Sequence, residues 1–438
     1  MKYVTPRSTS IAVSVLSLVV ILIMIITKGN LMLYDEHNFI PNIHSLQQLG
    51  LTKKFLLGMS GSPGPTYAVI HYLFIGLTHF NITYIRITNF ALLLLLLFVI
   101  YLNARLLKAT DPLIITANFI VIPIIWVSCG LALTEIPAML CAAVSVYLLL
   151  ECFTKDHKFI TRLILIVLAG TFLSFAILGR TFFLMIILVI PAYLLIKFLL
   201  ATFDNNLKQD GSNLLKHLPG NKQLLILGII FLACSLYLPL KVFTIWHALA
   251  PPQDTKLVGA NNLSLVPWFC ILSFCYCGFI TLILAPNWFV INRRLLIITI
   301  VISGIFLFIN IYKGYFEFAP FLSAAVKFLS PGGFSIYQRI IPALVFLFAF
   351  HFILSSVIRL WENRSDTIFI FLGLTILFIA FSTIKVKAQF SSRYVAQIIP
   401  FFLLLFIGYE RTNWQKVIRV SIAAALGFVS LYFYYIGS

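Results

Sequence analysis

Long apolar runs recur along the whole chain, each close to the roughly twenty residues that a helix needs to cross a bilayer. Short segments between them hold nearly all the charge. Hydrophobic residues make up 61% of the 438 positions and charged residues only 10%, which is too much apolar surface for soluble domains to hide. The sequence therefore predicts an all-α integral membrane protein, with residues 1–438 forming one transmembrane domain.

We predict about thirteen membrane-spanning helices. The first run, Ile11 to Ile26, follows Lys2 and Arg7 and lacks a small-x-small cleavage site, so we interpret it as a retained signal anchor. The predicted spans are residues 9–28, 83–107, 112–129, 136–153, 160–178, 181–201, 223–243, 265–286, 295–312, 335–358, 366–384, 394–409 and 417–436.

Basic residues indicate how these spans are oriented. If the N-terminus is cytoplasmic, every cytoplasmic loop is basic, as the positive-inside rule requires. The loop at 202–222 is one of these cytoplasmic segments. The net charge of +18 then reflects topology and attraction to anionic lipid head groups, and nucleic-acid binding is not expected. The cytoplasmic basic residues include Arg105, Lys108, Lys155, Lys158, Arg162, Lys208, Lys216, Lys222, Arg293, Arg294, Arg359, Arg364, Arg411, Lys416 and Arg419.

Three longer segments, residues 29–82, 243–264 and 312–334, fall on the extracytoplasmic side in this topology. We call residues 29–82 the acidic loop. Within it, the stretch from Thr66 to Leu77 is apolar but too short for a span, and counting it as one would invert every later loop against the charge rule. We therefore expect a juxtamembrane helix lying in the membrane interface.

Asp35 and Glu36 follow the first span closely, and two adjacent carboxylates near lipid are costly to leave unpaired. Such a carboxylate can serve as a general base for a hydroxyl group. Alternatively, Asp35 caps a helix that begins at Glu36 or His37. His37 and His44 could join Asp35 around a divalent metal, but this spacing is a weak pattern, and we predict no metal and no required cofactor. The seven scattered cysteines are interpreted as packing residues.

Two further polar residues belong to the same side of the membrane. Glu135 lies at the outer start of the predicted fourth span, and Arg180 lies at the outer junction between the fifth and sixth. Both fit either a functional site or an interfacial anchor.

Lys385, Lys387 and Arg393, followed by Tyr394, form a cationic segment on the outer side with no acidic residue nearby in the sequence. An outer cationic loop runs against the charge rule. Phosphate would account for it, because arginine offers a bidentate fork and lysine a point charge. The alternative is a small solvated loop.

These features, in this order, resemble the GT-C glycosyltransferases, membrane enzymes that take a sugar from a polyprenyl-phosphate carrier. Asp35-Glu36-x-x-Phe39-Ile40-Pro41 together with Ile85-Arg86-Ile87-Thr88-Asn89 looks most like the α-1,2-glucosyltransferase that uses dolichyl-phosphate glucose, and bacterial relatives of unknown acceptor are similar as well. Protein O-mannosyltransferases and the lipid A aminoarabinose transferase are more distant. The resemblance rests on Asp35-Glu36-x-x-Phe39-Ile40-Pro41, Pro63-Gly64-Pro65-Thr66-Tyr67, Tyr84-Ile85-Arg86-Ile87-Thr88-Asn89, Glu135, and Arg393-Tyr394 with Pro400.

The resemblance implies transfer of a hexose-type sugar to a glycan, lipid or protein acceptor on the extracytoplasmic face. Asp35 would be the base, with Glu36 orienting the acceptor or substituting for Asp35, in an inverting displacement. Arg393 would hold the lipid phosphate. The chain shows no retrieval tail, which favours a bacterial inner membrane over the endoplasmic reticulum. The other implied site residues are Arg180, Lys385 and Lys387 at the phosphate, Glu135 as a further acid, and His37, Tyr67, Arg86 and Tyr394 around the substrate.

Two other classes remain open, a transporter or flippase of lipid-linked glycans and a non-catalytic subunit of envelope assembly. Transporters place charges and broken helices near the bilayer midplane and often show repeated halves. Here the spans are nearly free of charge, and the sequence shows no clear internal repeat. This pattern favours the enzyme.

Overall fold

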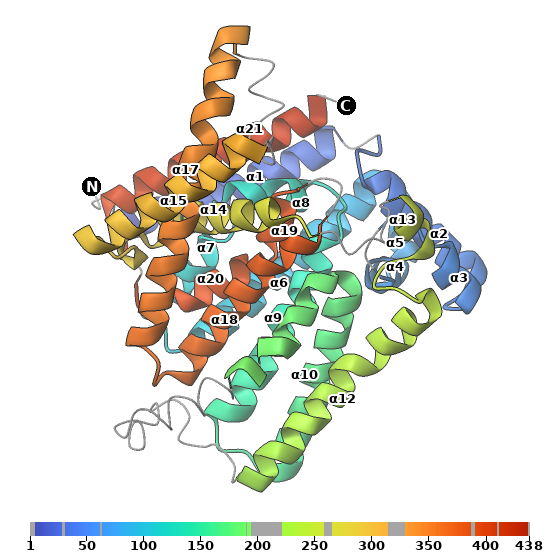
Figure 1. The fold of residues 1–438 in the computed structure, drawn as a ribbon. Coiled ribbons are helices and arrows are strands. Elements are labelled where there is room, and N and C mark those ends of the chain that lie inside the picture. The colour runs from blue at the N-terminus through green and yellow to red at the C-terminus, as the bar shows by residue number, and fades with distance from the viewer. Residues whose placement is uncertain are drawn as a thin grey trace.

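The computed structural model describes residues 5–28, 31–61, 64–189, 191–193, 221–257, 265–313, 329–386, 390–409 and 411–436. Across these residues the chain is all-α, without strands, and ten helices are long and apolar enough to cross a membrane (Figure 1). The chain is therefore a multi-pass integral membrane protein.

The ten long helices correspond to ten of the predicted spans, with ends that agree within about four residues. Each is apolar around most of its circumference, as expected for helices that contact lipid on one side and protein on the other. They are α1 (Pro6–Thr27), α6 (Ile82–Leu106), α9 (Glu135–Thr154), α10 (Phe159–Gly179), α12 (Asn221–Trp246), α14 (Pro267–Leu284), α15 (Arg293–Lys313), α17 (Pro331–Glu362), α18 (Thr367–Ser382) and α21 (Trp414–Ile436).

Two predicted spans are not continuous helices. Residues 112–129 divide into α7 (Pro112–Ala117), the 3-10 helix η1 (Pro123–Ile125) and α8 (Trp126–Gly130). Residues 394–409 divide into α19 (Arg393–Ala396) and α20 (Ile399–Leu405). Proline explains both breaks in part, because Pro123 and Pro400 lack a backbone donor and occupy the first turns of new helical segments.

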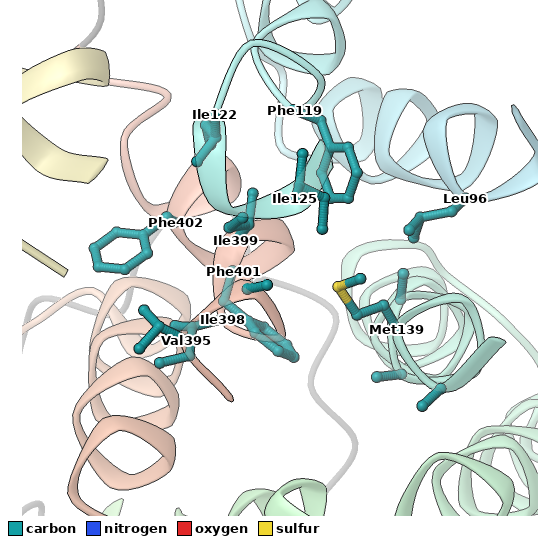
Figure 2. Packing of buried hydrophobic residues seen from close by; sticks show 14 of the residues in the cluster. Leu96, Phe119, Ile122, Ile125, Met139, Val395, Ile398, Ile399, Phe401 and Phe402 are labelled. Atoms are coloured by element: carbon teal, nitrogen blue, oxygen red, sulfur yellow. The ribbon is translucent and has the colours of Figure 1, made fainter. Parts of the chain in front are cut away.

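The two broken segments pack against each other in the core (Figure 2). Phe119, Ile122 and Ile125 of the first and Ile398 and Phe402 of the second are fully shielded from solvent. Irregular backbone at membrane depth is tolerated where protein covers it. The sequence could not reveal this arrangement, because the composition of both segments is as apolar as that of a true span.

Other predicted segments lie partly outside the described residues. The predicted span 181–201 begins with the 3-10 helix η2 (Thr181–Phe183), and only residues 181–189 and 191–193 of it are described. Most of the predicted loops 202–222 and 312–334 lies outside the description, and α17 already begins at Pro331.

The acidic loop folds over one end of the helix bundle, which we call the acidic-loop end. It contains α2 (Glu36–Leu49), α3 (Lys53–Gly58), α4 (Thr66–Tyr72) and α5 (Ile75–Thr78), so the predicted juxtamembrane helix is two short ones. Hydrogen bonds tie it to the ends of the long helices. The Thr66 hydroxyl donates to the Phe175 carbonyl over 2.7 Å, and the Trp246 indole donates to the Leu56 carbonyl over 2.7 Å.

Candidate active site

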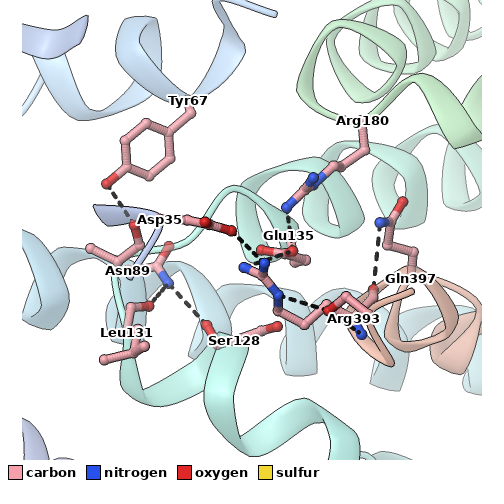
Figure 3. A network of polar contacts seen from close by, with 11 residues as sticks. Asp35, Tyr67, Asn89, Ser128, Leu131, Glu135, Arg180, Arg393 and Gln397 are labelled. Carbon is pink, nitrogen blue, oxygen red and sulfur yellow. Dashed lines mark hydrogen bonds and ion pairs between the residues drawn. The ribbon is translucent and has the colours of Figure 1, made fainter. Parts of the chain in front are cut away.

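Four charged side chains meet at the acidic-loop end, and we call Asp35, Glu135, Arg180 and Arg393 the charge cluster (Figure 3). Arg393 forms an ion pair with Asp35, and its Nη1 lies 3.7 Å from Oε1 of Glu135. Arg180 donates to that same oxygen of Glu135. The cluster therefore holds two carboxylates and two guanidinium groups in direct contact.

Each member of the charge cluster stands at the end of a helix. Glu135 is the first residue of α9, Arg180 directly follows α10, and Arg393 is the first residue of α19. Asp35 occupies the N-cap position of α2, but its side chain makes no capping hydrogen bond and instead reaches Arg393. The predicted capping position is thus right, whereas the side chain serves a tertiary contact.

Members of the cluster differ in exposure. The Asp35 side chain is 39% exposed and that of Arg393 is 18% exposed, whereas Glu135 is fully buried. An incoming molecule therefore meets Asp35 and Arg393 first. A buried carboxylate such as Glu135 is stable only when paired, and the two arginines supply that pairing.

Burial lowers the pKa of Arg393, but the carboxylates of Glu135 and Asp35 raise it more, so the net pKa lies above the ordinary value. Arg393 therefore remains charged under all physiological conditions. A permanent cation at a partly open position is suited to binding an anion.

Several buried polar atoms around the cluster lack a hydrogen-bond partner among the described residues. They are Oε2 of Glu135, Nε of Arg180 and Oε1 of Gln397. Gln397 is fully buried, and its amide nitrogen lies 3.5 Å from the Arg393 carbonyl. Sequence reasoning missed this residue, although it follows Arg393 by four positions and so shares its helix face. Buried polar atoms normally have partners, so these atoms mark a polar site.

The predicted acidic pair separates in the structure. Glu36 is fully buried and accepts two hydrogen bonds from Arg86, of 2.8 Å and 2.6 Å. It also accepts from the backbone N–H groups of Ala132, over 2.7 Å, and Leu33, over 2.8 Å. Glu36 and Arg86 thus form a buried ion pair apart from the charge cluster, and their roles at the acceptor and in the substrate loop stay predictions. Successive residues at a helix start point in different directions, so only Asp35 reaches the cluster.

Two predicted aromatic residues are integrated into the fold. Tyr67 is buried, its hydroxyl donates to the Ala132 carbonyl over 2.9 Å, and burial raises its pKa well above the ordinary value. The Tyr394 ring packs 5.1 Å from the Phe182 ring centroid. Tyr67 therefore stays protonated, and Tyr394 is held by ring packing.

Of the remaining predicted site residues, Lys385 and His37 belong to no ion pair of the charge cluster. Lys385 is exposed at the end of the 3-10 helix η6 (Thr383–Lys385), and Lys387 lies outside the described residues. His37 is exposed on α2, and the His44 ring stacks on Phe80 with centroids 3.5 Å apart. The described part of the chain contains no group of three or more His, Cys, Asp or Glu side chains that could hold a metal ion.

Glycine allows the backbone to close around the cluster. A Cβ atom on Gly179 would lie 2.7 Å from Cβ of Ala138, and one on Gly64 would lie 2.5 Å from the Leu178 carbonyl oxygen. These contacts would be too short, so α4, α9 and α10 approach this closely only because both positions lack a side chain. Arg180 follows Gly179 directly, and its position beside Glu135 depends on this contact.

Among known proteins, the chain shows similarity to solved structures but to no protein-family model and no curated protein. The chain is similar to the archaeal oligosaccharyltransferase AglB from Archaeoglobus fulgidus, in complex with an inhibitory peptide and a dolichol-phosphate. The identity is 16%, the TM-score is 0.47, and the match covers 98% of this chain and 55% of that one. This chain therefore spans about half the length of AglB.

A second similarity is to ArnT from Cupriavidus metallidurans, in the apo state and bound to undecaprenyl phosphate. Both structures are 12% identical to this chain, with TM-scores of 0.40 and 0.36. Each match covers 97% of this chain and 77% of that one.

Proposed function

We propose that this protein is a GT-C-type glycosyltransferase that moves a hexose-type sugar from a polyprenyl-phosphate carrier to a glycan, lipid or protein acceptor. The observation that supports this best is the charge cluster, in which four distant chain segments bring two carboxylates and two arginines together at one end of a membrane bundle. The sequence resemblance to the superfamily rests partly on the same residues. We place the reaction on the extracytoplasmic face, in keeping with the charge of the loops.

The donor phosphate binds at Arg393, and Arg180 assists as a second guanidinium group of the same cluster. In the reaction, the bond between the anomeric carbon and the phosphate oxygen breaks, and its electron pair stays on the phosphate. The leaving group thus gains negative charge in the transition state. Fixed guanidinium groups stabilise charge that develops in this way, and arginine can hold a phosphate with two hydrogen bonds.

Asp35 serves as the general base. An acceptor hydroxyl oxygen attacks the anomeric carbon from the face opposite to the phosphate, its proton passes to the Asp35 carboxylate, and the configuration inverts. Asp35 suits this role because it is the most exposed acid of the cluster. Glu135 positions both arginines from its buried site.

The ion pair between Asp35 and Arg393 makes these two steps interdependent. Without donor, Arg393 holds the carboxylate that must later accept the proton. A donor phosphate competes with Asp35 for the same guanidinium group, so its binding releases the base. The base is then free only when a donor is present.

Asp35→Asn gives the direct test, because the amide keeps the shape of the carboxylate but cannot accept the proton. We expect it to lower transfer from polyprenyl-phosphate sugars to a membrane extract by about a hundred- to ten-thousandfold. Asp254→Asn is the matched control, since Asp254 lies at the same end, accepts from the Gly61 backbone N–H over 3.2 Å, and belongs to no pair in the cluster. Full transfer by Asp35→Asn would remove Asp35 from the mechanism.

One observation favours a transporter as the second candidate, because broken helical segments such as α7 to α8 and α19 to α20 are common in transporters. In this chain the breaks are filled by apolar side chains such as Ile122 and Ile398, and the charge cluster lies at one end of the bundle. A wild-type protein that consumes no polyprenyl-phosphate sugar, yet moves one across vesicle membranes, would establish the transporter instead.

A further inference from the structure

A second polar site lies at the end of the bundle opposite to the charge cluster. A cavity of about 130 Å³ opens there beside the start of α21. Its polar lining comes from two arginines, three side-chain amides and one tyrosine, which are Arg411, Arg419, Asn287, Asn413, Gln415 and Tyr409.

The cavity is far from the charge cluster. Trp414 begins α21 at the cavity, whereas Tyr435, near the other end of that helix, donates from its hydroxyl to the Gly130 carbonyl over 2.6 Å at the acidic-loop end. At about 1.5 Å per residue, the helix separates the two sites by roughly 30 Å. A ligand in this cavity therefore has no contact with the proposed reaction.

Tertiary contacts hold the cavity walls in place. Nη2 of Arg359 donates to the Asn287 carbonyl over 2.9 Å, and its guanidinium lies 5.6 Å from the Tyr409 ring centroid. The Asn363 amide lies 3.2 Å from the Tyr409 hydroxyl. Nε of Arg419 donates to the Ile283 carbonyl over 3.2 Å. The Arg419 guanidinium is thus held through its Nε atom, and its two terminal nitrogens are left for a ligand.

Among the described residues, the cavity is lined by two arginines and no acid. Neither Arg411 nor Arg419 has a carboxylate partner in the part of the chain that the structure describes. Two acids at this end are already paired, since Asp111 contacts Arg7 at 2.5 Å and Glu362 contacts Arg359 at 2.9 Å. Guanidinium and amide donors around a small cavity match a phosphate group.

Tryptophans indicate that the cavity lies at the depth of lipid head groups. Trp414 is 50% exposed beside the cavity, and Trp361, two residues beyond Arg359, is 60% exposed. Exposed tryptophans of membrane proteins concentrate at the boundary between hydrocarbon and water. A cavity at this depth is in direct reach of lipid head groups, which favours a lipid over a soluble anion as its ligand.

We propose that this cavity binds the phosphate head group of an anionic phospholipid. Arg411 and Arg419 hold the phosphate, and the side-chain amides of Asn287, Asn413 and Gln415 contact its oxygens or the polar group attached to it. Basic pockets between membrane helices bind anionic lipids in this way. The bound lipid links the loop after α14 to the start of α21 and so stabilises this end of the bundle.

The test compares thermal stability of the full chain in nanodiscs of phosphatidylglycerol and of phosphatidylcholine. Wild type should unfold at a higher temperature in phosphatidylglycerol, and Arg411→Gln/Arg419→Gln should lose more than half of that difference. Arg293→Gln/Arg294→Gln is the matched control, because it removes the same charge from exposed residues outside the cavity, and it should keep the difference.

Two outcomes would overturn the proposal. If both double variants lose the lipid-dependent difference in unfolding temperature equally, the stabilisation comes from general attraction between basic residues and anionic lipid and not from the cavity. An equally large, Arg419-dependent stabilisation by inorganic phosphate in detergent would make the ligand a soluble anion. If Arg411→Gln/Arg419→Gln does not fold, Arg411→Lys/Arg419→Lys replaces it, and native mass spectrometry should show fewer retained phosphatidylglycerol molecules than on wild type.

Discussion

Arg393 forms an ion pair with Asp35 across 358 positions of sequence, and the same guanidinium group approaches Glu135 at 3.7 Å. Arg393, at the start of α19, thus contacts both the acidic loop and the start of α9. Because the Asp35 side chain is partly exposed and that of Glu135 is buried, a molecule that competes for Arg393 displaces Asp35 first. We therefore expect the charge of Asp35 to weaken the binding of a donor phosphate to Arg393.

Removing the negative charge of Asp35 should strengthen donor binding while it weakens transfer. In Asp35→Asn, Arg393 loses a competing carboxylate, so a polyprenyl phosphate should bind with a lower Kd than to wild type. Isothermal titration in detergent measures this binding, with Asp254→Asn as the control that should leave Kd unchanged. Weaker binding by Asp35→Asn would contradict competition for the guanidinium group.

Replacing Arg393 by lysine should impair the reaction although the charge is kept. Lysine is a point charge and cannot present the planar fork that binds phosphate through two hydrogen bonds. We expect kcat/KM for a polyprenyl-phosphate sugar to fall about a hundredfold, as when one preorganised donor is lost. Lys385→Gln, at an exposed position outside the cluster, should have little effect. The opposite ranking of the two variants would move the phosphate site to Lys385.

Breaking the buried pair of Glu36 and Arg86 should affect stability before it affects chemistry. Both side chains are fully buried, and a lone buried charge typically costs about 3–5 kcal/mol. Glu36→Gln should therefore lower the unfolding temperature strongly. Glu362→Gln breaks the half-exposed pair with Arg359 and should lower it only slightly. If Glu36→Gln has normal stability but no transfer activity, Glu36 takes part in the reaction itself.

Adding a methyl group at Gly179 should disturb the charge cluster. Gly179→Ala places a Cβ 2.7 Å from Cβ of Ala138, so α9 and α10 must separate, at a cost of about 1–3 kcal/mol. Arg180 should shift from Glu135, and transfer should fall with stability. Gly228→Ala in α12 is the matched control, because its new Cβ would meet no atom within 4 Å. Thermal unfolding and transfer assays on both variants measure the difference.

The orientation in the membrane should follow the loop charges. In a variant without the seven native cysteines, a cysteine at exposed His37 should react with an impermeant thiol reagent from the extracytoplasmic side. A cysteine at exposed Arg411 should react only after the cytoplasmic side is opened. The reverse labelling pattern would place the charge cluster on the cytoplasmic face.

The sequence by itself determined the class of the fold. Ten predicted spans appear as continuous helices because length and apolarity suffice to make a helix in lipid. Residues 112–129 and 394–409 are similarly apolar but break, in part at Pro123 and Pro400. These breaks are tolerated because neighbouring residues cover the irregular backbone. Whether a break is tolerated depends on what surrounds it, and a local pattern does not contain that information.

The candidate site divides in the same way. Local position and charge singled out Asp35, Glu135, Arg180 and Arg393 one by one, because charges at the ends of apolar helices are conspicuous. Only the tertiary structure decided that these four touch and that the neighbouring Glu36 turns away to Arg86. Ion pairs form between groups that packing brings together, and adjacent residues at a helix start point in different directions, so sequence proximity could not separate the two carboxylates.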